Sequence, residues 1–450
     1  MTDLSAGGAL RAPRPKSSLL IEDARTRKRN AAERRFKMYG LCAVLMGVAA
    51  LIMLLVSILG NGMSAFQQTY VTLQVELPAD KLDKAGNRNR DEMAKVSTFG
   101  YAPLIATAME RTVTDLGIDT PLSTKDQGAI ISKEAAAQLR NFVLANPQIL
   151  GETVKFEFLA NGRIDGYLKD RVTRETAALD KNVSPEQLDL TDVLMENGIL
   201  EQRFNWAFLT MPDASGQRPE AAGLGVAIMG SLYMMLIVLA LALPIGVAAS
   251  IYLEEFAPKN RITDLIEVNI SNLAAVPSIV FGILGLAIFI NLAGLPQSAP
   301  IVGGLVLTLM TLPTIIIATR ASLKAVPPSI RDAALGVGAS RMQSVFHHVL
   351  PLAAPGILTG TIIGLAQALG ETAPLLLIGM VAFVRDYPSG PPEGFFDPAS
   401  ALPVQIYNWT QRSDPAFVER ASGAIIVLLI FLVSMNALAI FLRRRFERRW

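Results

Sequence analysis

The sequence has few of the residues that metal, redox and nucleotide-hydrolysing sites need. Its 450 residues include one cysteine, Cys42, and two histidines, the neighbours His347 and His348. A single cysteine excludes an internal disulfide framework, and two adjacent imidazoles supply too few ligands for a zinc or haem site. No Gly-Lys dipeptide occurs, so there is no Walker A loop for ATP. We therefore expect no metal site and no cofactor in this chain.

Charge is also scarce. Charged residues make up 18% of the chain, hydrophobic residues make up 51%, and the net charge is +2. Because soluble domains are usually about one quarter charged, this deficit indicates membrane segments. So small a net charge provides no bulk cationic surface for phosphate backbones, and we expect no nucleic-acid partner.

Uncharged runs locate the membrane segments. They cover residues 38–75, 221–253, 270–319, 352–384 (with Glu371 as the one charge) and 421–442. A spanning helix needs about 20 apolar residues, so residues 270–319 are interpreted as two spans with a short turn. The sequence therefore predicts six transmembrane helices. The first, centred on residues 41–59, lies in a longer uncharged run than a signal peptide requires and is interpreted as a retained anchor.

Lysine and arginine placement orients these spans. Residues 1–37 hold ten Lys and Arg residues, and residues 443–450 hold five. The loop at residues 320–351 is basic as well. Positive charge marks the inner side, so both termini and this loop are predicted to be cytoplasmic. Residues 25–37 are either a lipid- or partner-binding arm or, the interpretation that we favour, a flank that fixes topology.

The orientation places two segments outside. Residues 61–220 have ordinary mixed composition, with strands predicted at 70–77 and 154–159, a turn at Asn161-Gly162, and helices at 133–144 and 188–208. We expect a small α+β domain inserted after the first span. Residues 385–420, rich in proline and glycine, predict an ordered loop.

The basic loop carries its own structural signals. Ser329 and Asp332 form a possible capping box after two prolines, which predicts a short helix from Ile330 that ends at Gly336 and Gly338. A second short helix is predicted over residues 340–350, with Pro351 as its stop.

The same loop resembles the EAA motif of ABC-importer permeases, with Asp332 in place of the usual Glu and His348 in place of an Ile. In that family the loop docks on the ATP-binding subunit. The resemblance implies this ATPase-coupling role for Asp332, Ala333, Ala334, Gly338, Leu350 and Pro351.

Four further segments are similar to the PstA family of phosphate permease subunits: residues 272–285, 307–314, 368–376 and 402–409. Together with the loop they cover residues from about 221 to 442, and the N-terminal half resembles the extra region of long family members. The resemblance implies a bacterial inner (plasma) membrane protein that is not itself an enzyme. Its implied partners are a PstC-like permease in a heterodimer, a PstB-like ATPase dimer that binds ATP and Mg, an extracytoplasmic phosphate-binding protein, inorganic phosphate and membrane lipid.

Glu371 is the charged residue nearest the middle of a predicted span. An ionised side chain there costs at least about 2.5 kcal/mol, so it is by default a candidate functional residue. It either serves transport or gating, or pairs with an arginine of a neighbouring subunit. The resembling permeases often have an arginine one turn earlier, where this chain has Gln367. Candidates for the translocation path or gating are Glu371, Gln367, Thr372 and the intramembrane prolines Pro277 and Pro313.

The predicted fold class is an all-α polytopic membrane protein of the ABC-importer permease type, with six transmembrane helices and an inserted α+β extracytoplasmic domain. The expected parts are a basic cytoplasmic arm (1–37), the first transmembrane helix (38–60), the outer domain (61–220), a five-helix permease core (221–442) with coupling loop 320–351, and a basic tail (443–450). Two alternatives stay open: a permease for another oxyanion, such as tungstate or molybdate, and a membrane sensor or scaffold protein.

Overall fold

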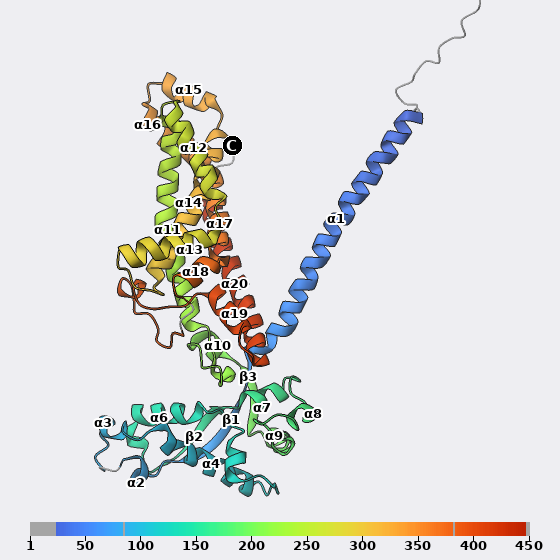
Figure 1. The fold of residues 1–450 in the computed structure, drawn as a ribbon, viewed down its shortest axis with the longest axis vertical. Coiled ribbons are helices and arrows are strands. Elements are labelled where there is room, and N and C mark those ends of the chain that lie inside the picture. The colour runs from blue at the N-terminus through green and yellow to red at the C-terminus, as the bar shows by residue number, and fades with distance from the viewer. Residues whose placement is uncertain (1–23, 84–85, 381–382, 447–450) are drawn as a thin grey trace, which may run out of the picture. The chain divides into compact units, whose positions relative to one another are not determined.

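The computed structural model describes residues 24–83, 86–380 and 383–446. Residues 1–23 of the predicted arm and residues 447–450 of the predicted tail lie outside this described part. The chain divides into two compact units, Met1–Ser57 and Ile58–Trp450. Helices predominate in the described residues of both (Figure 1).

The first long helix, α1 (Ala24–Gly62), runs without interruption over 39 residues. Residues 25–37 form its first turns, where Lys37 pairs with Glu33 at 2.6 Å. Between residues 36 and 59 its large apolar side chains are exposed, apart from the partly buried Ile58. So much exposed apolar surface suits a lipid environment, and the stretch is long enough to span one.

A three-stranded antiparallel sheet organises the next part of the chain, which we call the α/β region (residues 67–210). The strand order is β2–β1–β3, made by β2 (Thr153–Leu159), β1 (Gln67–Glu76) and β3 (Leu200–Phe204) (Figure 1). In the first pair Leu73 lies opposite Phe156. The strands predicted at residues 70–77 and 154–159 are confirmed.

The third strand replaces part of a predicted helix. The helix α9 (Pro185–Glu196) ends before Gly198, whose φ of +70° is a conformation that suits glycine and reverses the chain. The helix predicted over residues 188–208 is therefore wrong beyond Glu196, since β3 pairs there with β1. The predicted turn at Asn161 is also wrong, because the Asn161 side chain accepts a hydrogen bond from the Arg163 N–H and caps α7 (Gly162–Tyr167).

Helices complete the core of the α/β region. α4 (Thr98–Asp115) packs on β1, and α6 (Ala135–Ala145), close to the helix predicted at 133–144, packs on β2. The β1 side chains Val71, Leu73 and Val75 alternate inward and are at most 1% exposed. The other elements from α1 to the end of this region are η1 (Met63–Phe66), α2 (Ala79–Leu82), α3 (Arg90–Met93), α5 (Thr124–Gly128), η2 (Pro147–Ile149), α8 (Arg174–Ala177) and α10 (Trp206–Thr210).

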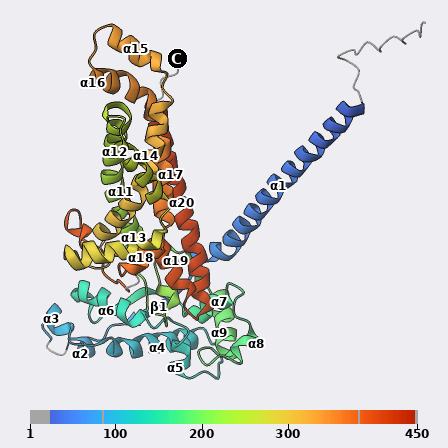
Figure 2. The ribbon, with the colours of Figure 1, turned by 45° about the horizontal axis from the view of Figure 1, so that its top comes forward.

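Four long helices form a bundle: α11 (Gly225–Ile251), α14 (Pro300–Lys324), α17 (Leu350–Gly370) and α20 (Pro415–Phe446). α14 packs against both α11 and α17, and α17 packs against α20 (Figure 2). Together with α1 they give five helices, among the described residues, that are long and apolar enough to cross a membrane. The shorter elements here are η3 (Pro219–Ala221), η4 (Tyr252–Phe256), η5 (Leu286–Leu292), α15 (Pro328–Gly336), α16 (Arg341–Gln343), η6 (Ser344–Val349), α18 (Ala373–Leu377), η7 (Glu393–Phe395) and α19 (Leu402–Thr410).

The third predicted span is a bent pair. α12 (Arg261–Ala274) and the helical segment that starts with α13 (Ser278–Gly285) meet at 100°. Pro277 lies at the break, where its ring fixes φ and its nitrogen has no hydrogen to donate. Counted as one span, this pair brings the total to six, as the sequence predicts.

The segment predicted as an ordered loop at residues 385–420 contains a helix, α19, so that prediction is incomplete. Pro403 lies in the first turn of α19, where its missing N–H has no intrahelical partner to lose. The Trp409 indole of α19 is fully buried and donates to Asp213 Oδ1 at 2.9 Å. This contact holds the segment against the chain that leads into α11.

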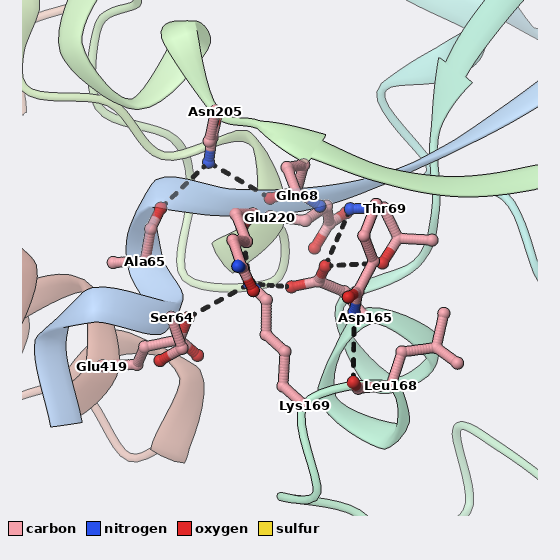
Figure 3. Close-up of polar contacts among 12 residues, drawn as sticks. Ser64, Ala65, Gln68, Thr69, Asp165, Leu168, Lys169, Asn205, Glu220 and Glu419 are labelled. Carbon is pink, nitrogen blue, oxygen red and sulfur yellow. Dashed lines mark hydrogen bonds and ion pairs between the residues drawn. The ribbon is translucent and has the colours of Figure 1, made fainter. Parts of the chain in front are cut away.

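Buried charges join the α/β region to the beginning of α20 (Figure 3). Lys169 Nζ lies 2.7 Å from Asp165 Oδ2 and 3.1 Å from Glu419 Oε1, and these three side chains are at most 4% exposed. Asp165 also accepts hydrogen bonds from the N–H and the hydroxyl of Thr69 in β1. Arg171 approaches the other Glu419 oxygen at 2.7 Å. The opposite charges compensate one another where water is excluded.

The next residue of α20 extends this network. Arg420 is 2% exposed and donates to Gln68 Oε1 in β1 at 2.6 Å and to the Glu220 carbonyl oxygen at 3.1 Å. Its guanidinium also lies 5.3 Å from the centre of the Phe208 ring. The sheet, η3 and α20 therefore share one buried polar cluster.

Removal of one member of this cluster tests its contribution to stability. Asp165→Ala removes one of the two carboxylates that compensate Lys169 and leaves the N–H and hydroxyl of Thr69 without their buried acceptor, so we expect it to lower the free energy of unfolding by about 3–5 kcal/mol. The control Arg203→Ala removes ion pairs to Glu157 and Glu201 whose side chains are 44–51% exposed. Such exposed pairs contribute about 0–1 kcal/mol. The measurement is thermal unfolding of the purified variants in detergent. Equal losses of stability in the two variants would contradict a stabilising role for the buried cluster.

Candidate coupling and translocation site

The coupling loop begins with α15, whose N-cap residue is Pro327. The predicted capping box at Ser329 is wrong, because the helix starts at Pro328, two residues before the predicted start at Ile330. Proline suits this first helical position because its ring already fixes a helical φ. A capping box is present instead at Ser340, which exchanges hydrogen bonds with Gln343. The predicted end of the helix is confirmed, since α15 ends at Gly336 and Gly338 has a φ of +92°.

The predicted stop at Pro351 is wrong. A single helical stretch runs from Arg341 to Gly370, and Pro351 lies inside it. The preceding turns, η6 (Ser344–Val349), are a π-helix. Proline cannot donate a backbone hydrogen bond and its ring crowds the preceding turn, and a wider turn relieves that crowding. Leu350 and Pro351 thus lie in the first turn of α17, both partly buried.

An arginine fixes α15 to the rest of the bundle. The Arg331 guanidinium donates to Glu255 Oε1 at 2.6 and 3.1 Å, and Glu255 belongs to η4 at the end of α11. Arg331 also donates to the carbonyl oxygens of Leu323 and Val326, at 2.9 and 2.8 Å, at the end of α14. The two charged side chains are only 22% and 11% exposed. We call this arrangement the Arg331 clamp, because charge-assisted bonds there join three segments.

A second ion-pair group lies beside the clamp. Arg320 of α14 lies 2.5 Å from Glu267 of α12 and 3.4 Å from Glu254 of η4. Lys324 approaches Glu254 at 3.5 Å, but its side chain is 59% exposed. From the sequence, the arginines of this loop indicated only its orientation, and neither ion-pair group was predicted. The available signal was the adjacent pair Glu254-Glu255, two carboxylates that directly follow a long uncharged run and need cationic partners nearby.

Anchoring leaves one side of the coupling loop free. Asp332 and Ala333 are exposed, whereas Ala334 is 6% exposed and faces the bundle. Beyond them the apolar side chains of Leu335, Val337 and Met342 are 44%, 87% and 62% exposed. A loop that is held by buried ion pairs and presents apolar side chains outward is suited to bind another protein.

Glu371 occupies a different place from the one predicted. It is not in the middle of a helix but is the C-cap residue of α17, with an extended backbone at φ −76° and ψ 129°. Thr372 follows as the N-cap of the short helix α18, so the candidate span Arg341–Gly370 ends directly before Glu371. The Glu371 side chain is partly buried, and no side-chain hydrogen bond or ion pair to it is present among the described residues. Gln367 lies on α17 one turn earlier and is exposed.

The interruption after Glu371 packs beside the segment that follows the break at Pro277. A Cβ on Gly282 of α13 would lie 2.7 Å from Pro374 Cα of α18, so only glycine allows this approach. The two segments run in the same direction, because Gly285, further along α13, faces Ile378. Broken backbone is tolerated at membrane depth where protein or a cavity satisfies it, and here the chain brings both breaks into neighbouring elements.

Pro313 does not join this pair of breaks. It is buried inside α14, which continues through it without interruption. The structure therefore groups Pro277, Glu371 and Thr372 at helix breaks, whereas Pro313 lies in an intact helix.

The comparisons with known proteins agree with this geometry. Residues 242–450 match the family model "Binding-protein-dependent transport system inner membrane component". The probable ABC transporter permease protein YqgI of Bacillus subtilis is 32% identical over 261 residues, which cover 56% of this chain and 86% of that protein. The phosphate transport system permease protein PstA of Mycobacterium leprae is 31% identical over 238 residues, 52% of this chain and 74% of that protein. The chain belongs to the PstA-type permease family.

The PstA-type part of the chain contains both candidate sites. The Arg331 clamp and the helix breaks all lie within residues 242–450. The α/β region overlaps a second match, over residues 23–178, to a domain of unknown function named DUF3333. Among solved structures, an inward-facing MetNI methionine ABC transporter is similar with a TM-score of 0.38 and 15% identity, covering 50% of this chain and 95% of that one, values too low to support a conclusion.

Hydrogen exchange tests whether the clamp holds the coupling helix. Arg331→Gln removes the charge and most of the bonds to Glu255, Leu323 and Val326, each worth about 1.5–3 kcal/mol at a charged group. We expect the amides of α15 to exchange roughly tenfold faster or more. Lys324→Gln removes only the exposed contact to Glu254 and serves as the control. Equal exchange of α15 in the two variants would contradict the clamp.

Proposed function

We propose that this chain is the transmembrane permease subunit of an ATP-driven importer of inorganic phosphate, and that it forms half of the translocation path. The anchored coupling loop is the observation that carries this proposal. Its exposed apolar residues form a surface for a separate ATPase, while the Arg331 clamp transmits force from that surface to α11 and α14. Hydrolysis of ATP, with its Mg, takes place on that partner.

The substrate assignment is supported by the names of the relatives. Besides the Mycobacterium leprae protein, the phosphate transport system permease protein PstA of Xylella fastidiosa is 31% identical over 228 residues, 50% of this chain and 77% of that protein. A permease for tungstate or molybdate is the nearest alternative. The proposal extends to a PstC-like permease as heterodimer partner, a PstB-like ATPase dimer and an extracytoplasmic phosphate-binding protein.

The proposed topology follows from charge. The basic residues of the first turns of α1 and of the coupling loop mark the cytoplasmic side of a bacterial plasma membrane. The α/β region would then lie outside, with both termini inside. The exposed residues Asp332, Ala333 and Gly338 of the loop would face the ATPase, while Leu350 and Pro351 would join the loop to α17.

The helix breaks provide the proposed path. Glu371, Thr372 and Pro277 lie where the backbone leaves helical geometry, and Gln367 lies one turn from Glu371. A carboxylate cannot be the main ligand of an anion, because the two charges repel. Glu371 is therefore proposed to accept a proton or to pair with an arginine of the PstC-like subunit, with Pro313 allowing α14 to adjust beside it.

The docking role of the loop predicts a specific defect. Val337→Asp places a charge in the apolar surface that would contact the ATPase, where a buried charge without a partner is costly. We expect phosphate uptake and binding-protein-stimulated ATP hydrolysis to fall about tenfold or more, equivalent to about 1.4 kcal/mol. Val337→Ile is the control that keeps the surface apolar. Equal activity of the two variants, at equal amounts in the membrane, would rule out this surface.

Uptake of phosphate tests the transport proposal directly. In a bacterial strain that lacks this chain, the wild-type protein should restore binding-protein-dependent phosphate uptake. Glu371→Gln should reduce that uptake about tenfold or more, since it removes the one charge at the helix break. Glu393→Gln, at an exposed carboxylate of η7, should leave it unchanged. Restored uptake of tungstate or molybdate in place of phosphate would contradict the substrate assignment but would still agree with a role as an ABC permease.

A further inference from the structure

The α/β region contains a groove of about 980 Å³ that the transport proposal does not use. Its walls come from α4, α5 and α6 and from the residues that link α5 to α6. Six of the lining residues are alanines, and Phe99, which is 85% exposed, stands at one side. This volume is in the range of sites for small organic molecules, whose walls are mainly apolar.

Charge around the groove has one sign. Lys125, Lys133 and Arg218 line it, and among the described lining residues there is no carboxylate. Arg218 is paired with Glu134 from outside the lining, whereas no ion pair to Lys125 or Lys133 is present among the described residues. Two exposed ammonium groups beside apolar walls are complementary to a molecule with an anionic head and an apolar body.

The same features disfavour other classes of ligand. An inorganic oxyanion such as phosphate would find donors in the lysine, arginine, threonine and asparagine side chains of the lining, but it would leave the apolar walls, which are most of the lining surface, without a partner. A divalent cation needs carboxylate or carbonyl oxygens, and a cluster of lysine and arginine repels it. The groove therefore fits neither phosphate nor a metal ion as well as it fits a molecule that is both anionic and apolar.

The groove also touches the joint between the α/β region and the bundle. Ser132, which lines it, is 3% exposed and donates to Glu220 Oε1 at 2.5 Å. Glu220 is 7% exposed, and burial raises the pKa of its carboxyl, while the bond from Ser132 opposes that shift. Its carbonyl oxygen accepts the hydrogen bond from Arg420 of α20. Two hydrogen bonds, both made by Glu220, therefore connect Ser132 in the wall of the groove to Arg420 at the beginning of α20.

We propose that this groove is a binding site for a single-chain amphipathic carboxylate, a molecule of the fatty-acid class. The apolar chain lies along the alanine walls of α4 and α6, and the carboxylate lies between Lys125 and Lys133. A single chain suits a volume within the range of drug-sized ligands, whereas a two-chain phospholipid is larger than such a molecule.

The test uses the full-length protein in nanodiscs of neutral phosphatidylcholine, with the fluorescent fatty acid dansylundecanoic acid as the probe. We expect saturable binding, and Lys125→Gln together with Lys133→Gln should weaken it roughly fivefold to tenfold, as two partly exposed charge contacts imply. Ala102→Trp fills the groove from an exposed position of α4 and should abolish the saturable signal. Lys155→Gln, an exposed lysine of β2 outside the groove, is the charge control.

Three outcomes would overturn the proposal. The first is the absence of saturable binding. The second is binding that neither Ala102→Trp nor the double lysine variant changes, because such binding is partition of the probe into the bilayer. The third is loss of the Ala102-dependent signal in nanodiscs of anionic phosphatidylglycerol that added fatty acid does not restore, because a phospholipid then occupies the groove. The binding assay needs no transport activity, so its result is independent of the proposed importer function.

Discussion

Backbone hydrogen bonding in a lipid environment is the constraint on which the rest of the structure depends. Each N–H and C=O at membrane depth must find its partner within the protein, so long uninterrupted helices are the default. The chain departs from that default at Pro277 and after Glu371, and it brings the two departures side by side through the close approach of Gly282 to Pro374. Interruptions that are packed together in this way bring non-helical backbone and the carboxylate of Glu371 close to one place, which is why we propose the translocation site there and not along an intact helix such as α14.

The coupling loop meets a different requirement. If it transmits force from an ATPase, as we propose, it must be rigid relative to the helices that it moves. The Arg331 guanidinium meets this requirement because it binds one carboxylate and two carbonyl oxygens at once, which fixes its orientation as well as its position. A lysine could form only part of this set, since its ammonium group has no planar fork.

The sequence predicted the elements whose signals are local and periodic. Uncharged runs located the spans, alternation in residues 70–77 located β1, and Gly338 marked the end of α15. The errors occur where a distant contact or an irregular helical turn decides. β3 has one buried side chain and forms because β1 offers it a free edge, and the helix through Pro351 continues because a π-turn accommodates the proline. Neither the Arg331–Glu255 contact nor the Lys169–Glu419 contact could be predicted, because the partners are 76 and 250 residues apart in the chain.

Buried charges also decide which parts of the chain can move relative to one another. The Asp165–Lys169–Glu419 contacts and the Arg420 bonds to Gln68 and Glu220 tie the beginning of α20 to β1 and to η3, which leads into α11. Separation of such pairs would leave uncompensated charges in a dry environment at about 3–5 kcal/mol each. We therefore expect the starts of α11 and α20 to keep their contacts with the α/β region in any rearrangement. The bent pair around Pro277 and the turn after Glu371 carry no such buried ion pairs among the described residues, and they are where we expect the chain to adjust.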